Sequence, residues 1–302
     1  MRILITGANG QLGQTFKCNI PDGIELIRAN KNNFNLLDNN QCFKKILDIR
    51  PDWILNFAAY TNVDLAEKEE AIAFQANGEV LDSISKAALI TGTNILHIST
   101  DFVFDGKQNF PYQPYQNKNP INIYGLSKSQ GEDYLMKNLN KKNQSIILRT
   151  SWLMGPFGNN FALTMLKLMK TKKQIGVVSD QVGCPTSTFT LSQAIWKIIN
   201  TKNIFSEYKS NIPIFHFSDC GVASWYDVAI KLQEFFIDLN LIQNPIDIFP
   251  LKTIEFPTPA KRPKYSILDC DKTYETFKLK KIHWSKALKE SLREINKFGM
   301  YD

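Results

Sequence analysis

The stretch YGLSK, from Tyr124 to Lys128, sets a phenol and an ammonium four residues apart, directly after the loop PYQNKNPINI. Residues at this spacing share one face of a helix, so both side chains point the same way if a helix begins here. A free tyrosine, with a pKa near ~10, is a poor proton donor at neutral pH, but a neighbouring cation stabilises its phenolate. The pair is a candidate for acid–base chemistry. The competing interpretation is a packed ring beside a solvated amine.

An apolar run that precedes the pair ends in hydroxyls. The run TNILHIST closes on Ser99 and Thr100, where a parallel sheet presents the residues that face its ligand. Tyr124 would give a proton to a carbonyl oxygen as hydride reaches the carbon, while Thr100 hydrogen-bonds that oxygen. Lys128 would tune Tyr124 and hold the ribose of a nicotinamide cofactor. These three groups are the predicted catalytic residues.

Short apolar runs alternate with stretches of helix length along the first half of the chain. The runs are RILIT, IELI, DWILNFA, TNILHIST and QSIILRT. This alternation indicates right-handed βαβ units, and hence a Rossmann-type, doubly wound α/β fold with a parallel sheet. Between the third and fourth runs, the pattern AIAFQANGEVLDSISKAALITG predicts a helix that ends at Gly92. Asn77 is expected within that helix, most simply as a polar residue on its solvent side.

A glycine-rich turn follows the first predicted strand directly. Gly7, Gly10 and Gly13 are spaced GxxGxxG rather than GxGxxG, and the helical pattern QTFKCNI comes next. Such a turn lets the backbone approach a pyrophosphate at a helix N-terminus. Out of context, the same string fits a tight strand-to-helix turn without a ligand equally well. Its position after the first strand of an alternating chain favours a dinucleotide.

The end of the second predicted strand bears on which dinucleotide binds. An acidic residue there would accept a hydrogen bond from the ribose 2′-hydroxyl of NAD, but the segment offers Arg28, Asn30 and Lys31 and no carboxylate. A cation suits a 2′-phosphate, so NADPH is favoured and NADH is the alternative. Ala58 and Ala59, at the end of the third strand, leave room for a flat cofactor, or serve only packing.

Composition excludes several classes of protein. A chain of 302 residues, 43% hydrophobic and 22% charged, can form one large domain or a domain with a smaller lobe. Its five cysteines include no CxxC and no Cys/His cluster, so neither a disulfide framework nor a zinc site is expected. The net charge of +7 is scattered, which favours solvated helix faces over nucleic-acid binding. Without a signal peptide or membrane span, we expect a soluble cytoplasmic protein.

The second half of the chain loses the strict alternation. We expect a cofactor-binding domain over residues 1–150 and mainly a substrate-binding lobe over 151–302, part of which returns to the sheet. Trp152 would stack on a sugar or fill the core, and Asn160 would lie at the entrance with DQVGCPT, whose Gly183/Pro185 turn either contacts substrate or only shapes the loop. Lys261 and Arg262 lie on a proline-stiffened loop, and contact with a diphosphate is favoured there over anchoring of the last helices.

Several blocks together carry a family resemblance. GxxGxxG at residues 7 to 13, Thr100 and Tyr124-x-x-x-Lys128 resemble the extended short-chain dehydrogenase/reductase superfamily. More narrowly, GANGQLGQ, NFAAYTNVD, STDFVFDG, YGLSKSQGE, LRTSWL, DQVGCPT and PTPAKRPKYSILD are similar, in order, to the dTDP-4-dehydrorhamnose reductase family. The resemblance runs from residue 1 to about residue 295.

The resemblance implies reduction of the 4-keto group of dTDP-4-dehydro-β-L-rhamnose to dTDP-L-rhamnose with NADPH or NADH. It implies roles for matched residues, in chain order: Gly10, Gln11 and Leu12 over the pyrophosphate; Asn35 and Leu36 beside the adenine; Ala59, Tyr60 and Thr61 along the cofactor; Thr100 and Asp101 at the substrate; Tyr124 as proton donor with Lys128 as its partner; and Trp152 near the sugar.

Two departures from the family pattern leave questions open. Asn35 replaces the customary Asp, so the cofactor preference is not fixed, and Gln14-Thr15 lacks an acidic residue that some members use in metal-assisted dimer contacts. We therefore expect no metal and leave the oligomer, including a homodimer, open. Two alternatives remain: a reductase for a related dTDP-4-keto-6-deoxysugar, and a non-catalytic dinucleotide-binding regulatory subunit. Intact Thr100, Tyr124 and Lys128 argue against the second.

Overall fold

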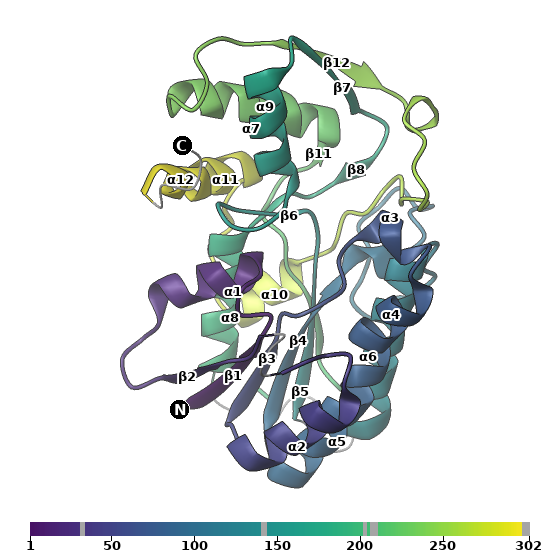
Figure 1. The fold of residues 1–302 in the computed structure, drawn as a ribbon, viewed down its shortest axis with the longest axis vertical. Coiled ribbons are helices and arrows are strands. Elements are labelled where there is room, and N and C mark those ends of the chain that lie inside the picture. Colours follow the sequence, from purple (N-terminus) through teal and green to yellow (C-terminus); the bar gives the residue numbers. More distant parts are fainter. Residues whose placement is uncertain (31–33, 140–143, 202–203, 206–210, 298–302) are drawn as a thin grey trace.

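A parallel sheet of six strands forms the centre of the protein, in the order β10-β5-β4-β3-β1-β2 (Figure 1). The computed structural model describes residues 1–30, 34–139, 144–201, 204–205 and 211–297, so Lys31 lies outside the described residues. The sheet strands are β1 (Arg2–Thr6), β2 (Glu25–Arg28), β3 (Trp53–Asn56), β4 (Asn94–Thr100), β5 (Ser145–Thr150) and β10 (Ile214–His216). The predicted doubly wound α/β fold is confirmed.

Helices cover both faces of this sheet (Figure 1). One face carries α1 (Gln11–Phe16), α8 (Thr188–Ile199) and α10 (Asp271–Thr276); the other carries α2 (Asn39–Ile49), α4 (Glu70–Phe74), α5 (Val80–Thr91) and α6 (Ile123–Leu139), with α3 (Val63–Ala66) at its edge. Alternate residues of each strand enter the two layers: Ile3 and Ile5 pack with Phe16, whereas Leu4 packs with Ile46. Burial on both faces explains why the strands read as continuous apolar runs.

The helix predicted before Gly92 contains an irregular turn. It forms as α4, a π-helical turn η2 (Gln75–Glu79) and α5, which ends at Gly92 with φ 72°. The expectation that Asn77 faces solvent is wrong, because its side chain is 1% exposed. A π turn holds one more residue than an α turn and so shifts the helix face locally. Asn77 thereby points to α6 instead of to water.

A smaller lobe lies beyond the carboxyl ends of the strands (Figure 1). Its strands are β6 (Leu153–Met154), β7 (Gln174–Val178), β8 (Val182–Gly183), β9 (Thr186–Ser187), β11 (Ala223–Ser224) and β12 (Asp247–Leu251), and its helices are α7 (Phe161–Thr171), α9 (Trp225–Asp238), α11 (Trp284–Leu292) and α12 (Glu294–Lys297). Short 3-10 turns are η1 (Lys17–Asn19), η3 (Asp101–Val103) and η4 (Thr253–Glu255). Within the described part of the chain, no helix is both long and apolar enough to cross a membrane.

The chain enters this lobe three times. It leaves the sheet after β5, returns through α8 and β10, enters the lobe again for β11 to β12, passes back through α10, and ends in α11 and α12. The lobe has its own apolar core, in which Leu166, Val228 and Leu288 from the three passes meet. The carboxyl ends of β1, β3 and β4 face this lobe, and the strand order reverses at β1, which is where a sheet of this type binds ligands.

Candidate active site

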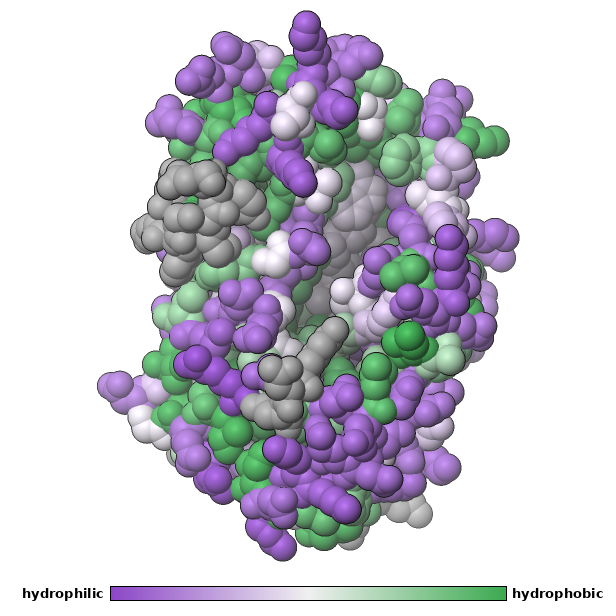
Figure 2. Space-filling model, in the orientation of Figure 1, coloured by the Kyte–Doolittle hydropathy of each residue, from purple (hydrophilic) through white to green (hydrophobic). Residues whose placement is uncertain are grey.

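A cleft of about 1180 Å³ lies between the strand ends and the lobe. Figure 2 shows this cleft as a deep hollow between the lobe and the sheet domain. The cleft is large enough for a dinucleotide and a second ligand, since single drug-sized ligands occupy ~300 to 1,000 Å³. The predicted residues that line it are Gly7, Gly10, Gln11, Leu12, Gly13, Asn35, Leu36, Ala58, Ala59, Tyr60, Thr61, Thr100, Asp101, Tyr124, Lys128, Trp152, Asn160 and Arg262. Arg28, exposed at the end of β2, and Lys261 are not among the lining residues.

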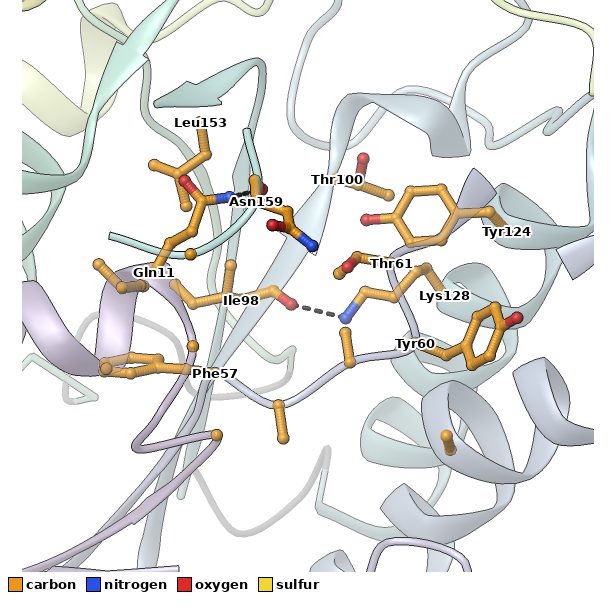
Figure 3. Close-up of a pocket in the computed structure, with 18 of the residues that line it drawn as sticks. Gln11, Phe57, Tyr60, Thr61, Ile98, Thr100, Tyr124, Lys128, Leu153 and Asn159 are labelled. Carbon is orange, nitrogen blue, oxygen red and sulfur yellow. Dashed lines mark hydrogen bonds between the residues drawn. The ribbon is translucent and has the colours of Figure 1, made fainter. Parts of the chain in front are cut away.

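The glycine turn brings the start of α1 against the end of β3. Gly7 has φ +67°, and a Cβ atom there would lie 2.7 Å from the backbone nitrogen of Ala58. A Cβ atom at Gly13 would lie 2.4 Å from the carbonyl oxygen of Gly7. Only glycine fits these two approaches, so the spacing seen in the sequence has a steric cause. On the lobe side, the amide of Gln11 donates to the carbonyl oxygen of Asn159 at 3.0 Å (Figure 3).

Gly7→Ala should destabilise the protein by at least ~2 kcal/mol, because the new methyl combines a left-handed backbone with overlap against backbone atoms. Gly23→Ala is the matched control. Gly23 also has a positive φ, +77°, but nothing lies within 4 Å of its Cβ position, so only ~1 kcal/mol is expected. Urea unfolding of the ligand-free proteins measures both, and equal losses would show that the close approach contributes nothing.

Tyr124 and Lys128 point into the cleft from the start of α6, towards Thr100 and Ile98 of β4 (Figure 3). The helix begins here because the Asn122 side-chain oxygen accepts a hydrogen bond from the Gly125 N–H at 2.7 Å. A Cβ atom at Gly125 would lie 2.2 Å from a backbone oxygen of the turn after β4, so glycine allows the close docking of α6. The end of β4 and the start of α6 therefore bring Thr100, Tyr124 and Lys128 to the same cleft, as predicted.

The Tyr124 ring packs edge-on against Phe102, at 5.6 Å between ring centroids. Burial raises the pKa of Tyr124 to about 12, a hydrogen bond with Thr100 opposes this shift, and the Asp101 carboxylate adds to it. At neutral pH the phenol is protonated. It is a donor ready to give its proton, and a nearby cation is needed to stabilise the phenolate that results.

The Lys128 amine turns to β4 rather than to the phenol. Its Nζ donates to the carbonyl oxygen of Ile98 at 2.7 Å and lies 3.2 Å from Nε2 of His97. Burial lowers the pKa of Lys128 to about 7, and the charge of Glu132 opposes that shift. Near neutral pH, Lys128 is therefore present in both its charged and its neutral form.

Asp101 is buried beside Thr100, whose Oγ1 donates to Asp101 Oδ1 at 3.1 Å. Burial raises the pKa of Asp101 to about 6, while hydrogen bonds from Ser266 and Thr100 oppose the shift. The carboxyl group thus sits at the cleft wall with its charge only partly stabilised. Such a group favours a ligand that brings hydroxyl donors.

Three residues predicted to bind substrate already have partners in the protein. The Trp152 ring stacks on Trp225 at 3.6 Å with 4° between planes, and a Cβ atom at Gly183 would lie 2.6 Å from the Trp152 ring. Asn160 caps α7, since its side-chain oxygen accepts from the Leu163 N–H at 3.1 Å. These contacts give the Gly183 turn and Asn160 clear structural roles. Trp152 packs against the lobe core and also lines the cleft.

The third residue with a partner is Arg262, on the loop between the prolines. Its guanidinium donates to both carboxylate oxygens of Asp64, at 3.1 and 2.7 Å. Asp64 belongs to α3, so this ion pair joins residues 198 apart in the sequence. Arg262 therefore anchors its loop to α3 rather than to the last helices, and it also lines the cleft.

Sequence reasoning missed or misplaced several residues of this site. Asn77 links the loop after β3 to α6: its oxygen accepts from the Tyr60 N–H at 2.8 Å and its amide donates to the Ser127 hydroxyl at 3.0 Å. Trp225 lines the cleft beside Trp152. Nothing in the sequence marks Trp225, but a polar residue at a helix interior near other signature blocks could have directed attention to Asn77. Tyr60 itself turns its hydroxyl to Glu69, at 2.7 Å.

No group of three or more His, Cys, Asp or Glu side chains in the described ranges is arranged to hold a metal ion. The cleft is lined by glycine backbone, alanines, hydroxyl and amide side chains, the Lys128 amine, the Asp101 carboxyl and the Arg262 guanidinium. Such a lining fits a dinucleotide, because the small residues of the glycine turn and at Ala58 and Ala59 let phosphates and flat rings approach the backbone.

Comparison with known proteins identifies one family over almost the whole chain. Residues 1–297 match the family model described as RmlD substrate binding domain. A dTDP-4-dehydrorhamnose reductase of Sinorhizobium fredii is 36% identical over 288 residues, 95% of each chain. The spore coat polysaccharide biosynthesis protein SpsK of Bacillus subtilis is 36% identical over 297 residues, 97% of each chain. The crystal structure of dTDP-4-dehydrorhamnose reductase from Bacillus anthracis in complex with NADP has a TM-score of 0.87 at 35% identity, covering 97% of this chain and 99% of that chain.

The family resemblance stated from the sequence blocks is thus confirmed, since the match extends beyond the shared Tyr-x-x-x-Lys pair to both the sheet and the lobe. With the cleft, the glycine turn and the strand ends arranged as described, the chain belongs to the dTDP-4-dehydrorhamnose reductase (RmlD) family of NAD(P)H-dependent oxidoreductases.

Proposed function

We propose that this protein reduces the 4-keto group of dTDP-4-dehydro-β-L-rhamnose to give dTDP-L-rhamnose, with NADPH as the favoured cofactor and NADH as the alternative. The observation that carries the proposal is the convergence of Thr100, Tyr124 and Lys128 on the same cleft as the glycine turn. Relatives with this reductase name match over nearly the whole chain, which supports the same substrate class here.

The cleft residues divide the cofactor among them in this proposal. Bound NADPH would supply the hydride. Its pyrophosphate would lie over the glycine turn, formed by Gly7, Gly10, Gln11, Leu12 and Gly13; its adenine beside Asn35 and Leu36; and its nicotinamide end along Ala58, Ala59, Tyr60 and Thr61, with Lys128 holding the ribose. Arg28 lies at the end of β2, and a cation near that strand end suits a 2′-phosphate.

Each catalytic residue has one role in the proton balance. As hydride adds to C4 of the sugar, the Tyr124 hydroxyl donates its proton to O4, and the C=O bond becomes a secondary alcohol. The Thr100 hydroxyl, which donates to Asp101 in the structure, would turn its hydrogen to the same oxygen and stabilise its developing charge. Lys128 in its ammonium form stabilises the phenolate left on Tyr124, which then recovers a proton from solvent.

The substrate would lie on the lobe side of the cleft. We infer that Asp101 accepts a hydrogen bond from a sugar hydroxyl, that Trp152 packs against the sugar ring, and that Asn160 and Arg262 border the entrance. Since Arg262 is held by Asp64, diphosphate contact would use the rim of the guanidinium that faces the cleft. Residues 1–150 then bind the cofactor, and 151–302 mainly bind the sugar nucleotide.

The proposal is tested by following the absorbance of NADPH with purified protein and the 4-keto sugar nucleotide. Turnover is expected only when the sugar is present, with NADH compared at equal concentration, and NMR of the product identifies its stereochemistry. An epimeric alcohol would favour the related deoxysugar reductase. Tight dinucleotide binding without any turnover would contradict the reductase and favour a regulatory subunit.

A further inference from the structure

A row of buried polar side chains crosses the sheet under the cleft. Thr6 of β1 pairs in register with Asn56 of β3, and Asn56 pairs with His97 of β4. These three side chains are at most 2% exposed. Neighbouring partners in a sheet project to the same face, so the row runs unbroken to the face covered by α6, where it meets Lys128.

The hydrogen bonds of this row run in one direction. The Thr6 hydroxyl accepts from the Ala58 N–H at 3.2 Å and donates to Asn56 Oδ1 at 2.5 Å. Asn56 Nδ2, which can only donate, therefore faces Nδ1 of His97, at 2.8 Å. Nδ1 must be the accepting nitrogen of His97. In a neutral imidazole, the ring proton is then on Nε2, which faces Lys128.

Only a neutral amine completes this arrangement. Lys128 Nζ lies 3.2 Å from His97 Nε2 and donates to the Ile98 carbonyl at 2.7 Å. An ammonium has no lone pair and would oppose the Nε2–H, whereas a neutral amine accepts from it and still donates to Ile98. The opposite tautomer, with the proton on Nδ1, would require the Asn56 amide to be turned over. The Thr6 hydroxyl would then accept from both the Ala58 N–H and the Asn56 amide, and its own hydrogen would lose Asn56 as acceptor.

The charged groups around the Lys128 amine do not cancel the preference of the His97 N–H for its neutral form. From α6, Glu132 favours the ammonium, but its carboxylate is shared with Arg149 of β5 and with Lys118. From the end of β4, Asp101 lies by Tyr124 rather than in contact with Nζ. His97 is fully buried, and burial, the largest cause, holds its pKa well below the usual value, in keeping with a neutral ring.

We propose that His97 is a positioning residue: the Thr6–Asn56 row fixes its Nε2–H tautomer, and that N–H, donated to Lys128, favours the neutral form of the amine in the cofactor-free cleft. His97 thereby sets the pH at which Lys128 becomes the cation that the Tyr124 phenolate needs. The pH consequence rests on the proposed reductase function, whereas the tautomer does not.

The tautomer is measured on the unaltered protein without substrate. The chain has three histidines, so ¹⁵N-histidine labelling gives a simple spectrum in which His97→Gln assigns the signal. We expect a protonated Nε2 and a bare Nδ1 through neutral pH. A protonated Nδ1 or an imidazolium would overturn the proposal, and this result does not depend on any variant folding.

Asn56→Asp tests control over the amine. The carboxylate accepts from both Thr6 and His97 Nδ1–H, so the tautomer reverses and bare Nε2 accepts from the Lys128 ammonium. Since reduction needs that ammonium, kcat/KM falls as pH rises through the pKa of Lys128. The variant should move this fall upward by ~1 pH unit, which retains ~10-fold more relative activity above it. Asn94→Asp, which adds the same charge at the far end of β4, should not move it.

The outcomes separate the two proposals. If His97 has the expected tautomer but the fall of kcat/KM with pH does not move in Asn56→Asp, then His97 does not control Lys128, and that part of the proposal is overturned. The expected tautomer, reversed in Asn56→Asp, but no turnover with the 4-keto sugar nucleotide would reject the reductase and leave the His97 tautomer standing.

Discussion

Tyr124→Phe should lower kcat for reduction of the 4-keto sugar nucleotide by ~10²- to 10⁴-fold, the usual contribution of a positioned general acid. The variant keeps the ring and its edge-on contact with Phe102, so the cleft wall should retain its shape. Dinucleotide binding should remain within ~3-fold of the unaltered protein, because the hydroxyl is expected to act on the substrate oxygen. Stopped-flow assays with saturating NADPH measure the chemical step.

Tyr134→Phe is the matched control for this prediction. Tyr134 lies on the same helix, ten residues further on, and its ring packs on the apolar layer away from the cleft. Loss of its hydroxyl should leave kcat unchanged. If Tyr124→Phe also turned over at the unaltered rate, another group would have to protonate the sugar oxygen, and the mechanism would be wrong.

Arg149→Met should destabilise the protein by about 3 to 5 kcal/mol, since it leaves the buried Glu132 carboxylate with only the longer 3.5 Å contact to Lys118. Arg149 is 1% exposed, and its guanidinium donates to both oxygens of Glu132 at 2.9 and 2.7 Å. Urea unfolding should show the loss. Replacing Lys231 by Met, in the exposed pair with Glu234, should cost less than ~1 kcal/mol.

The pH dependence of stability identifies the cause. Burial opposes the charge of Glu132, but Arg149 and then Lys118 overcome it and lower the pKa from 4.5 to about 2. A depressed carboxyl pKa stabilises the fold above 4.5, and this contribution disappears as the pH falls from 4.5 through about 2. In Arg149→Met, the acid-side loss due to Glu132 should shrink, because only the weaker effects of Lys118 and Ser99 still lower its pKa. If the variant kept the same acid-side loss, Arg149 would not be the source of the shift.

Those parts of the site that depend on local sequence patterns could be predicted from the sequence. Tyr124 and Lys128 follow from helical spacing, and Thr100 follows from the end of an apolar run in an alternating chain. The fold and the family followed from the same signals. The glycine turn was readable because its spacing has a local steric cause, the approach of Gly7 to β3.

The remaining parts depend on contacts between distant segments. Asn77 was assigned to solvent because periodicity assumes α-helical spacing, and the π turn changes that spacing for one turn. The row from Thr6 through Asn56 to His97 needs the register of three strands, which no single run reveals. The pairing of Arg262 with Asp64 likewise joins segments 198 residues apart. Each of these is a tertiary fact rather than a local one.

The three passes of the chain through the lobe have a consequence for how this protein can change. The first two passes return to the sheet, through α8 and β10 and then through α10, so a break in one pass leaves the lobe joined to the sheet by the others. The two walls of the cleft are therefore tethered at several points, which favours hinge-like motion of one wall against the other.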